Sequence, residues 1–310
     1  VPDPVINETD VLIKVNAFGI NPGDTYFRRN FENSDNSYRI LGYDFAGEII
    51  ATGSEVKDFE LGDNVFGIGD VRRSGSYAEM IAVDHRLIAK MPDEAFPEDL
   101  AGIPVAALTA WDALFRNNNE LPADVKNVLI VGAAGGVGTM AIQLLKSKTD
   151  ARIIATASRP ETRTWLQNFG VDLIIDHSED IPNQLKDNQI GHVDLIFAVN
   201  GLSDSVKWIP TVLRPYGHLA VIEIETGVDL WSLINQSFSI HLENVFTRNN
   251  NGYHIDDQGK ILGELSFLLS QKKIKSPVKT IFDGLSRSNI YEAHKYLESK
   301  TAIGKVVIKI

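Results

Sequence analysis

Residues 128–138 constrain the fold of this chain most strongly, because the apolar run VLIV leads directly into the glycine-rich segment GAAGGVG. Residues 139–146 follow with good helix formers and apolar side chains at roughly helical spacing. A strand, a glycine turn and a helix in this order suit a dinucleotide pyrophosphate, since glycines let the backbone approach the phosphates and the first N–H groups of the helix face negative charge. The strict fingerprint has glycine at 133, 135 and 138, and Ala133 departs from it. We predict a nucleotide site at Ala134, Gly135, Gly136 and Val137, although a turn without a ligand would also use glycines.

Downstream of residue 125, strand-like and helix-like segments alternate. Apolar runs predict strands at 127–131, 152–157, 172–176, 193–199 and 218–223. The segments between them predict helices at 138–146, 160–169, 181–187 and 205–213. Such alternation is typical of a parallel sheet wound on both faces, so the chain is predicted to be of the α/β class.

The rest of the sequence has a different texture. The first hundred residues hold short strand candidates at 11–17, 46–51, 64–67 and 78–82, separated by glycine-containing or charged turns. A helix rich in small residues is predicted at 105–115, and the tail predicts helices at 256–271 and 289–299 and a strand at 304–310. The length of 310 residues allows two domains of ordinary size.

Charge and composition exclude several classes of function. The formal net charge of −11 disfavours a broad binding surface for nucleic acid or an anionic membrane. The chain has no cysteine, which removes disulfides, thiolate zinc sites and cysteine nucleophiles together. No segment approaches the length of a membrane span and no signal peptide is visible, so we expect a cytoplasmic protein. Because the sequence starts at Val1 and not at methionine, we also expect that an N-terminal piece is missing.

Seven short motifs occur in a fixed order along the chain. They are NPGDTY at 21–26, LGYDFAGEI at 41–49, LGDNVF at 61–66, GSYAE at 75–79, ALTAW at 107–111, AHKYLESK at 293–300 and GKVV at 304–307. In this order they resemble the zinc-free quinone oxidoreductase branch of the medium-chain dehydrogenase/reductase superfamily. The resemblance implies a GroES-like β-rich catalytic domain, formed by residues 1–104 and 248–310, and a Rossmann cofactor-binding domain at 105–247. It also implies a homodimer.

The resemblance separates this chain from the zinc alcohol dehydrogenases of the same superfamily. Those enzymes carry a Gly-His-Glu motif where this chain has Gly42, Tyr43 and Asp44, so Tyr43 stands in place of the ligand histidine. The seven histidines lie far apart in the sequence, and no two of them are spaced i, i+4. We therefore predict no metal site. A metal-free nicotinamide site suits acceptors that need little oxygen activation, namely quinones or double bonds conjugated to a carbonyl.

Several residues acquire roles through the resemblance. Tyr26 is expected to hydrogen-bond the carbonyl oxygen of the acceptor, or else to pack beside Phe27 with its hydroxyl in solvent. Asn21 is expected to hydrogen-bond the nicotinamide ribose, and its alternative is to cap a turn. Thr109 lies in a small-residue helix that would let the nicotinamide approach, or is a core threonine bonded to its own backbone. Independently of the resemblance, Gly201 is expected to contact the cofactor because it follows the predicted strand at 193–199, at the end where cofactors bind, although a plain turn would also use glycine. Phe246 is a further expected cofactor contact.

The end of the second Rossmann strand predicts the choice of cofactor. An NAD-binding fold places Asp or Glu there, whereas this chain has Ser158 followed by Arg159. A hydroxyl and a guanidinium can hold a 2′-phosphate, so we predict NADPH; the alternative for Arg159 is a solvated surface charge. Arg163, one turn further along, is expected to face solvent. His177 and Lys300 match positions near the cofactor, although each would also suit an ordinary surface residue.

These observations predict an NADPH-dependent oxidoreductase that transfers hydride to a quinone without a metal. An NADPH-dependent enone or 2-alkenal reductase shares the fold and the cofactor, and a non-catalytic NADPH-binding protein is a third reading. The sequence leaves the acceptor open, because loops such as Phe31–Tyr38 are expected to line the substrate cleft and their shape cannot be derived from it.

Overall fold

The computed structural model describes residues 1–30, 38–116 and 118–310, which divide into two compact units. Unit 1 comprises residues 1–108 and 246–310, and unit 2 comprises residues 109–245. These limits differ by a few residues from the domain boundaries expected from the sequence. Residues 105–108 and 246–247 pack with unit 1, although they were assigned to the Rossmann domain.

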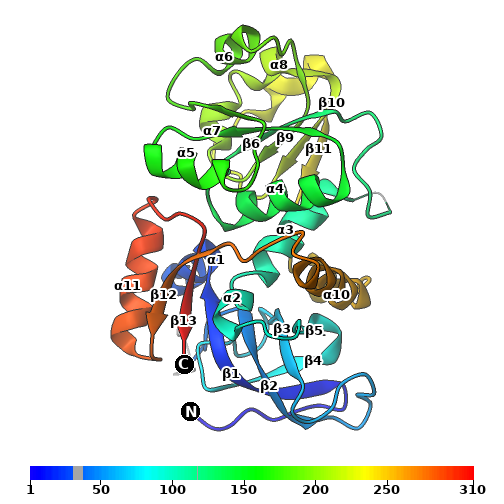
Figure 1. The fold of residues 1–310 in the computed structure, drawn as a ribbon, viewed down its shortest axis with the longest axis vertical. Helices are drawn as coiled ribbons and strands as arrows, with labels where there is room; N and C mark the ends of the chain where they lie inside the picture. Colours follow the sequence, from blue (N-terminus) through cyan, green and yellow to red (C-terminus); the bar gives the residue numbers. More distant parts are fainter. Residues whose placement is uncertain (31–37, 117) are drawn as a thin grey trace. The chain divides into compact units, whose positions relative to one another are not determined.

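Unit 1 is built on a seven-stranded sheet of order β12-β13-β1-β2-β3-β5, with β4 paired to β1. All pairs are antiparallel except β12 with β13. Figure 1 shows the C-terminal strand β13, in red, beside the blue strand β1, and the register pairs Ile20 with Val306. The strands are β1 (Asp10–Ile20), β2 (Asp44–Thr52), β3 (Asn64–Ile68), β4 (Met80–Asp84), β5 (Ile88–Lys90), β12 (Val278–Asp283) and β13 (Lys305–Lys309).

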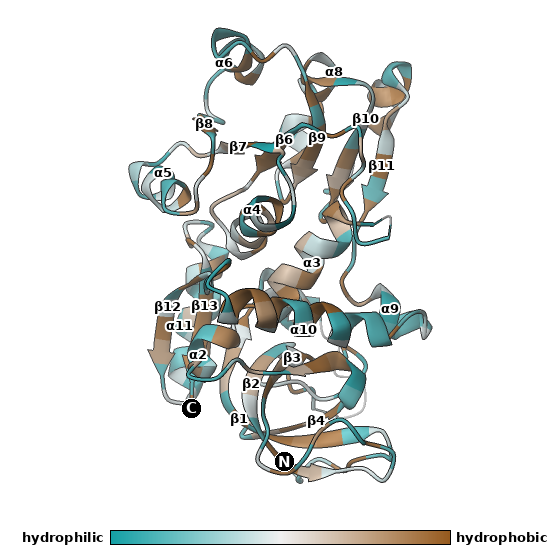
Figure 2. Cartoon of the chain, turned by 45° about the vertical axis from the view of Figure 1, so that its right-hand side comes forward, coloured by the Kyte–Doolittle hydropathy of each residue, from teal (hydrophilic) through white to brown (hydrophobic). Residues whose placement is uncertain are grey.

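Helices cover this sheet or connect its strands. They are α1 (Pro22–Asn30), α2 (Pro97–Leu100), α3 (Pro104–Leu114, which continues into unit 2), α9 (Thr247–Asn251), α10 (Asp256–Ser270) and α11 (Arg287–Glu298), with a 3₁₀ turn η1 (His85–Leu87). Helix α10 begins with two aspartates and buries Ile261, Leu262, Leu265 and Leu268, as expected of an amphipathic helix. In Figure 2, α10 is teal at the end near α9 and brown towards its other end.

Unit 2 contains six parallel strands in the order β11-β10-β9-β6-β7-β8. The chain moves outward from β6 in one direction and then returns to build the other half, which makes the sheet doubly wound. The predicted α/β class and parallel sheet are therefore confirmed. The strands are β6 (Asn127–Val131), β7 (Arg152–Thr156), β8 (Leu173–Ile175), β9 (Val193–Ala198), β10 (Leu213–Val221) and β11 (Ser239–Leu242).

Both faces of this sheet are covered. On one face, β-strand residues such as Leu129 and Ile196 form a core with α6 (Ile181–Asp187), α7 (Leu202–Ser205) and α8 (Ile209–Val212). Figure 1 shows α4 (Gly136–Lys148) on the opposite side of the sheet from α6 and α8. Helix α5 (Pro160–Gln167) follows β7, and a 3₁₀ segment η2 (Leu230–Gln236) precedes β11.

One predicted helix is wrong in detail. The segment at 205–213 is not continuous: α7 ends at Ser205, and α8 starts at Ile209 with Pro210 in its first turn. Proline has no N–H to donate to the preceding turn, so a new helix begins there. Within the described ranges, no helix is both long and apolar enough to cross a membrane.

Candidate functional site

The glycine turn of unit 2 joins β6 to α4. Gly132 has φ +77°, and a Cβ there would lie 2.5 Å from Oδ1 of Asn200, so the backbone requires glycine. A Cβ at Gly138 would lie 2.5 Å from both Cα and O of Ala133, so Gly138 lets the helix pack directly against the turn. Ala133, which departs from the fingerprint, is fully buried.

The start of α4 has the properties of an anion site. Gly135 is the N-cap and provides no side chain to cap the helix, so the first N–H groups are not satisfied by a cap side chain. The predicted residues 134–137 are partly exposed there. A helix of 13 residues adds a favourable dipole for negative charge at this end. This geometry can hold the pyrophosphate of a dinucleotide.

The neighbouring strand ends contribute further polar groups to the same edge of the sheet. Gly132 N donates to Oγ1 of Thr156 at 3.4 Å, and Asn200 follows β9, which is hydrogen-bonded to β6. Gly201 is the N-cap of α7 with φ +65°, and no atom of the described residues lies within 4 Å of a Cβ added to it. Ligands of open α/β sheets bind where the strand order reverses, here between β6 and β9. Asn200 was missed by the sequence analysis, although it stands directly before Gly201.

Three of the residues expected at the adenosine end occupy the ends of β7 and β8. Ser158 Oγ lies 3.3 Å from Nε2 of His177, which brings together two residues 19 positions apart. Arg159 is the N-cap of α5 and is partly exposed. The arrangement gathers a hydroxyl, an imidazole and a guanidinium on neighbouring loops, donors that suit a phosphate.

Arg163 does not simply face solvent, contrary to the sequence-based expectation. Its guanidinium donates to the carbonyl oxygens of Ala157 at 3.0 Å and Ile174 at 3.2 Å. Ala157 directly follows β7 and Ile174 lies in β8, so Arg163 connects the two loops that carry Ser158 and His177. Spacing alone could not reveal this contact, because Ile174 lies on another strand.

In unit 1, Asn21 belongs to a buried group of three polar side chains. Its Nδ2 donates to Oδ2 of Asp44 at 2.8 Å, and its Oδ1 accepts from Nζ of Lys305 at 2.6 Å. Lys305 Nζ also donates to Asp44 Oδ2 at 2.7 Å, which closes the triangle. Asp44 Oδ1 accepts from the backbone N of Val105 at 2.6 Å, in the first turn of α3. Asp44 is 0%, Lys305 5% and Asn21 8% exposed.

A second polar network holds the backbone of Asn21. Asp24 Oδ2 accepts from Asn21 N at 2.7 Å and from the hydroxyl of Tyr77 at 3.1 Å. The contact to Asn21 N is the capping-box contact that starts α1. Asp24 Oδ1 is buried with no hydrogen-bond partner among the described residues. Burial raises the pKa of Asp24 to about 7, although the hydrogen bond from the Asn21 backbone acts in the opposite direction.

This network continues to the surface through His294. Its Nε2 lies 3.0 Å from the Tyr77 hydroxyl, and its Nδ1 lies 3.2 Å from NH1 of Arg28. Arginine can only donate, so Nδ1 accepts and Nε2 carries the proton that points to Tyr77. Burial lowers the pKa of His294 to about 4, which keeps the ring neutral. Arg28 NH2 in turn donates to Glu298 at 2.5 Å.

Tyr26 and Phe246 lie at the two ends of an aromatic cluster in unit 1. The Tyr26 ring meets Phe27 edge-on at 6.0 Å between centroids, Phe27 meets Tyr43 at 5.6 Å, and Tyr43 meets Phe246 at 5.3 Å. Tyr43 is buried and its hydroxyl accepts from Arg39 at 3.1 Å. Tyr26 is 57% exposed, which suits both roles considered for it. Of the loop Phe31–Tyr38, residues 31–37 lie outside the described residues.

Two predicted residues remain to be placed, Thr109 and Lys300. Thr109 is buried in α3, and Lys300 is exposed after α11 with φ +58°. Across the part of the chain that the structure describes, no three His, Asp or Glu side chains gather as metal ligands.

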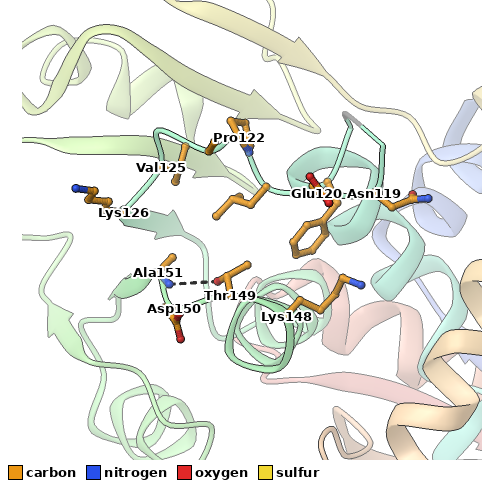
Figure 3. Close-up of a pocket in the computed structure, with 12 residues that line it drawn as sticks. Asn119, Glu120, Pro122, Val125, Lys126, Lys148, Thr149, Asp150 and Ala151 are labelled. Carbon is orange, nitrogen blue, oxygen red and sulfur yellow. Dashed lines mark hydrogen bonds between the residues drawn. The ribbon is translucent and has the colours of Figure 1, made fainter.

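A pocket in unit 2 lies away from the glycine turn. Figure 3 shows it between residues 148–151, which are the end of α4 and the segment after it, and residues 119–126, the segment before β6. It is therefore at the amino ends of the strands, whereas the nucleotide-binding features gather at the carboxyl ends. The pocket does not belong to the candidate cofactor site.

Comparison with known proteins agrees with this architecture. Residues 7–93 match the family described as the alcohol dehydrogenase GroES-like domain, and residues 136–247 match the family described as zinc-binding dehydrogenase. The β-rich unit 1 is therefore the GroES-like domain that the sequence predicts.

Individual relatives cover nearly the whole chain. A zinc-type alcohol dehydrogenase-like protein of Staphylococcus aureus is 32% identical over 99% of this chain and 92% of its own length. The NADPH-dependent alkenal/one oxidoreductase of Arabidopsis thaliana is 31% identical over 98% of this chain and 73% of its own length.

Solved structures show the same likeness. A candidate zinc-dependent alcohol dehydrogenase protein of Rhizobium etli has a TM-score of 0.95 and 33% identity, covering 100% of this chain and 92% of its own. The quinone oxidoreductase of Coxiella burnetii has a TM-score of 0.80 and 29% identity, covering 100% and 93%. The chain therefore belongs to the medium-chain dehydrogenase/reductase superfamily of NAD(P)-binding oxidoreductases, in its quinone oxidoreductase-like branch.

Proposed function

We propose that this protein reduces a quinone with NADPH and without a metal ion. The observation that carries the proposal is the edge of the unit 2 sheet. There the start of α4 offers uncapped N–H groups, and Ser158, Arg159 and His177 gather at the ends of β7 and β8. The two features suit the pyrophosphate and the 2′-phosphate of one dinucleotide.

The preference for NADPH rests on charge. The loop after β7 offers the guanidinium of Arg159 and a hydroxyl at Ser158, and no carboxylate stands at the strand end to pair with ribose hydroxyls. Arg163 supports this loop through its bonds to Ala157 and Ile174. Binding titrations with NADPH and with NADH, each followed by the fluorescence of the nucleotide, test the preference. Equal affinities for the two would contradict it.

The chemistry divides between cofactor and protein. Bound NADPH would supply the hydride. We propose that Asn21, held by Asp44 and Lys305, hydrogen-bonds the nicotinamide ribose, and that the Tyr26 hydroxyl donates to the carbonyl oxygen of the acceptor. As negative charge develops on that oxygen, the Tyr26 hydrogen bond strengthens, and water or the hydroxyl delivers the proton. Thr109, Gly201, Phe246 and Lys300 are proposed as further cofactor contacts.

A reaction without a metal is proposed because of the residues that stand where the zinc alcohol dehydrogenases have their zinc ligands. The chain has no cysteine, and Tyr43 stands where the zinc enzymes have histidine. The Tyr43 hydroxyl accepts from Arg39 and its ring packs between Phe27 and Phe246, so the side chain is used in the aromatic cluster. Because some relatives are named zinc-type, the metal content of the purified protein must be measured. Stoichiometric zinc, or turnover lost on chelation, would refute this part.

A second candidate is the reduction of an enone or 2-alkenal. It is favoured by the Arabidopsis relative, which is named an NADPH-dependent alkenal/one oxidoreductase. Steady-state NADPH oxidation with matched quinones and enones separates the two, since the better substrate class has the higher kcat/KM. Tight NADPH binding without turnover on either class would instead favour a binding protein.

We also propose a homodimer that forms along β11. This strand is at the edge of the unit 2 sheet and exposes Ile240 and Leu242, while Trp231 in η2 is 75% exposed. An open edge with exposed apolar side chains is suited to pairing with a second copy. Light scattering should give twice the chain mass, and Leu242→Lys should shift the protein to monomer. A cytoplasmic location stays a prediction.

A further inference from the structure

The buried group formed by Asn21, Asp44 and Lys305 in unit 1 determines the orientation of the Asn21 side-chain amide. Lysine can only donate hydrogen bonds, and an ionised carboxylate can only accept them. Lys305 must therefore face the oxygen of Asn21, at 2.6 Å, and Asp44 must face its nitrogen, at 2.8 Å. An asparagine with neutral partners could adopt either orientation, whereas the ion pair allows only one. The amide keeps one N–H free of these contacts.

The ion pair is poorly explained as a source of stability. Asp44 and Lys305 have side-chain exposures of 0% and 5%, so both lose nearly all their hydration on folding. A buried pair of this kind often contributes no more stability than apolar residues of similar size. The same strand β13 carries Lys309, which pairs at the surface with Glu98 at 2.7 Å and needs no burial. Lys305 differs from Lys309 in its burial and in its contact with Asn21.

Asp44 also contacts helix α3. Its other carboxylate oxygen accepts from Val105 N at the start of α3, the helix that contains Thr109. A negative charge at a helix N-terminus is favourable, so Asp44 fixes this end of α3 while it fixes the Asn21 amide. One carboxylate thus connects two of the residues proposed to contact the nicotinamide.

We propose that Lys305 and Asp44 are positioning residues for the reaction, which act by locking the Asn21 amide with one N–H presented to the cofactor. The inference rests on the proposed function, since it assumes that Asn21 contacts the bound nucleotide. It adds two residues that sequence analysis did not assign. Neither touches the reacting atoms; both act through Asn21.

The test is a double-mutant cycle between Lys305 and Asn21. Lys305→Met should lower kcat roughly 10- to 100-fold, the effect of a small misplacement of a positioning group. In the Asn21→Ala background, the same change should alter kcat by less than about twofold, because the group to be positioned is gone. Lys309→Met is the matched control, since it removes a lysine from the same strand without contacting Asn21, and kcat should stay unchanged. Equal effects of Lys305→Met in both backgrounds would overturn the inference.

A readout without turnover complements the kinetics. The side-chain amide signals of Asn21, assigned by their loss in Asn21→Ala, should shift in the ¹H–¹⁵N spectrum of Lys305→Met and stay in place in Lys309→Met. If both variants leave the Asn21 signals unchanged, Lys305 does not set the amide.

A double variant that replaces both charged residues by neutral ones distinguishes a loss of folding from a loss of positioning. Lys305→Met leaves Asp44 buried and unpaired, so Asp44→Asn with Lys305→Met removes both charges. This double variant should regain thermal stability but not kcat. Full recovery of kcat in it would refute the positioning role. If the unmodified protein neither binds nor oxidises NADPH, the proposed function fails instead, and the amide spectra still decide whether the ion pair orients Asn21.

Discussion

The hydroxyl of Tyr77 lies 3.1 Å from Oδ2 of Asp24 and 3.0 Å from Nε2 of His294, so one phenol joins a buried acid to a buried base. The neutral imidazole donates to the phenol oxygen and the phenol donates to the carboxylate. Because Asp24 also accepts from the backbone of Asn21, the state of this acid bears directly on the start of α1. Its titration is therefore a measurable property of the site.

Asp24→Asn should change how stability depends on pH. Asp24 has a pKa of about 7 in the folded protein against 3.8 as its usual value. Between these values the folded state holds a proton that the unfolded state has lost, so this contribution is full below pH 3.8 and is lost as pH rises through 7. The Asp24→Asn variant has no group that titrates at this position, so its free energy of unfolding does not include this pH-dependent loss. Relative to the unmodified protein, it should gain unfolding free energy as the pH is raised, measured by denaturant titration at several pH values.

His294 acts in the opposite direction and must be separated from Asp24. Its pKa is lowered from 6.5 to about 4, so its contribution is present above pH 6.5 and is lost as pH falls through 4. Most of the Asp24 loss overlaps with this window, and only its last part, just above pH 6.5, is free of the His294 contribution. A pH profile of Asp24→Asn parallel to that of the unmodified protein across this range would show that Asp24 is ionised in the fold.

Arg159→Ala should weaken NADPH binding selectively. Losing a hydrogen bond to a charged phosphate costs roughly 1.5–3 kcal/mol, whereas NADH has no 2′-phosphate and should bind as before. Arg152→Ala is the matched control, because Arg152 is an exposed arginine at the other end of β7. Fluorescence titration with both nucleotides gives the two affinities. An unchanged preference would remove Arg159 from the site.

Tyr26→Phe should lower kcat more than it changes the affinity for NADPH. The change removes only the hydroxyl proposed to bond the acceptor, and the ring can keep its contact with Phe27. Tyr253→Phe, which alters another exposed tyrosine of unit 1, should have no effect. Steady-state kinetics with the preferred acceptor measure the difference. If the two variants behave alike, Tyr26 has a packing role.

Gly138→Ala should destabilise unit 2 and weaken nucleotide binding together. The added Cβ would lie 2.5 Å from the backbone of Ala133, and overpacking of this kind costs about 1–3 kcal/mol. Gly191→Ala is the control, since no atom in the described part of the chain lies within 4 Å of a Cβ there. Thermal unfolding and NADPH titration report the two effects. Normal behaviour of Gly138→Ala would mean that the turn can open without loss of the site.

The sequence predicted most of what depends on local patterns. The strand, glycine turn and helix at 128–146 were recognisable because neighbouring residues define them, and the parallel strands of unit 2 followed from their apolar runs. Strand β11 was not predicted, because it has only four residues and their side chains are mostly exposed. The break before Pro210 was not predicted either, because apolar spacing continues across the two short helices.

The polar networks could not be predicted from local patterns. Asn21 and Lys305 are 284 positions apart, and only the pairing of β1 with β13 brings them together. Tyr77 and His294 are likewise 217 positions apart. Motif matching had marked each of these segments, but a motif does not say which of its residues will meet another motif in the fold.

The pairing of β13 with β1 has a consequence for synthesis on the ribosome. Unit 2 is complete in the nascent chain before β12 and β13 emerge, so it can fold first. Until then, β1 keeps an unsatisfied edge and the Asp44 carboxylate has no lysine to neutralise it. A chain that stops before Lys305 would therefore carry a finished nucleotide fold attached to an unfinished, aggregation-prone β-sheet.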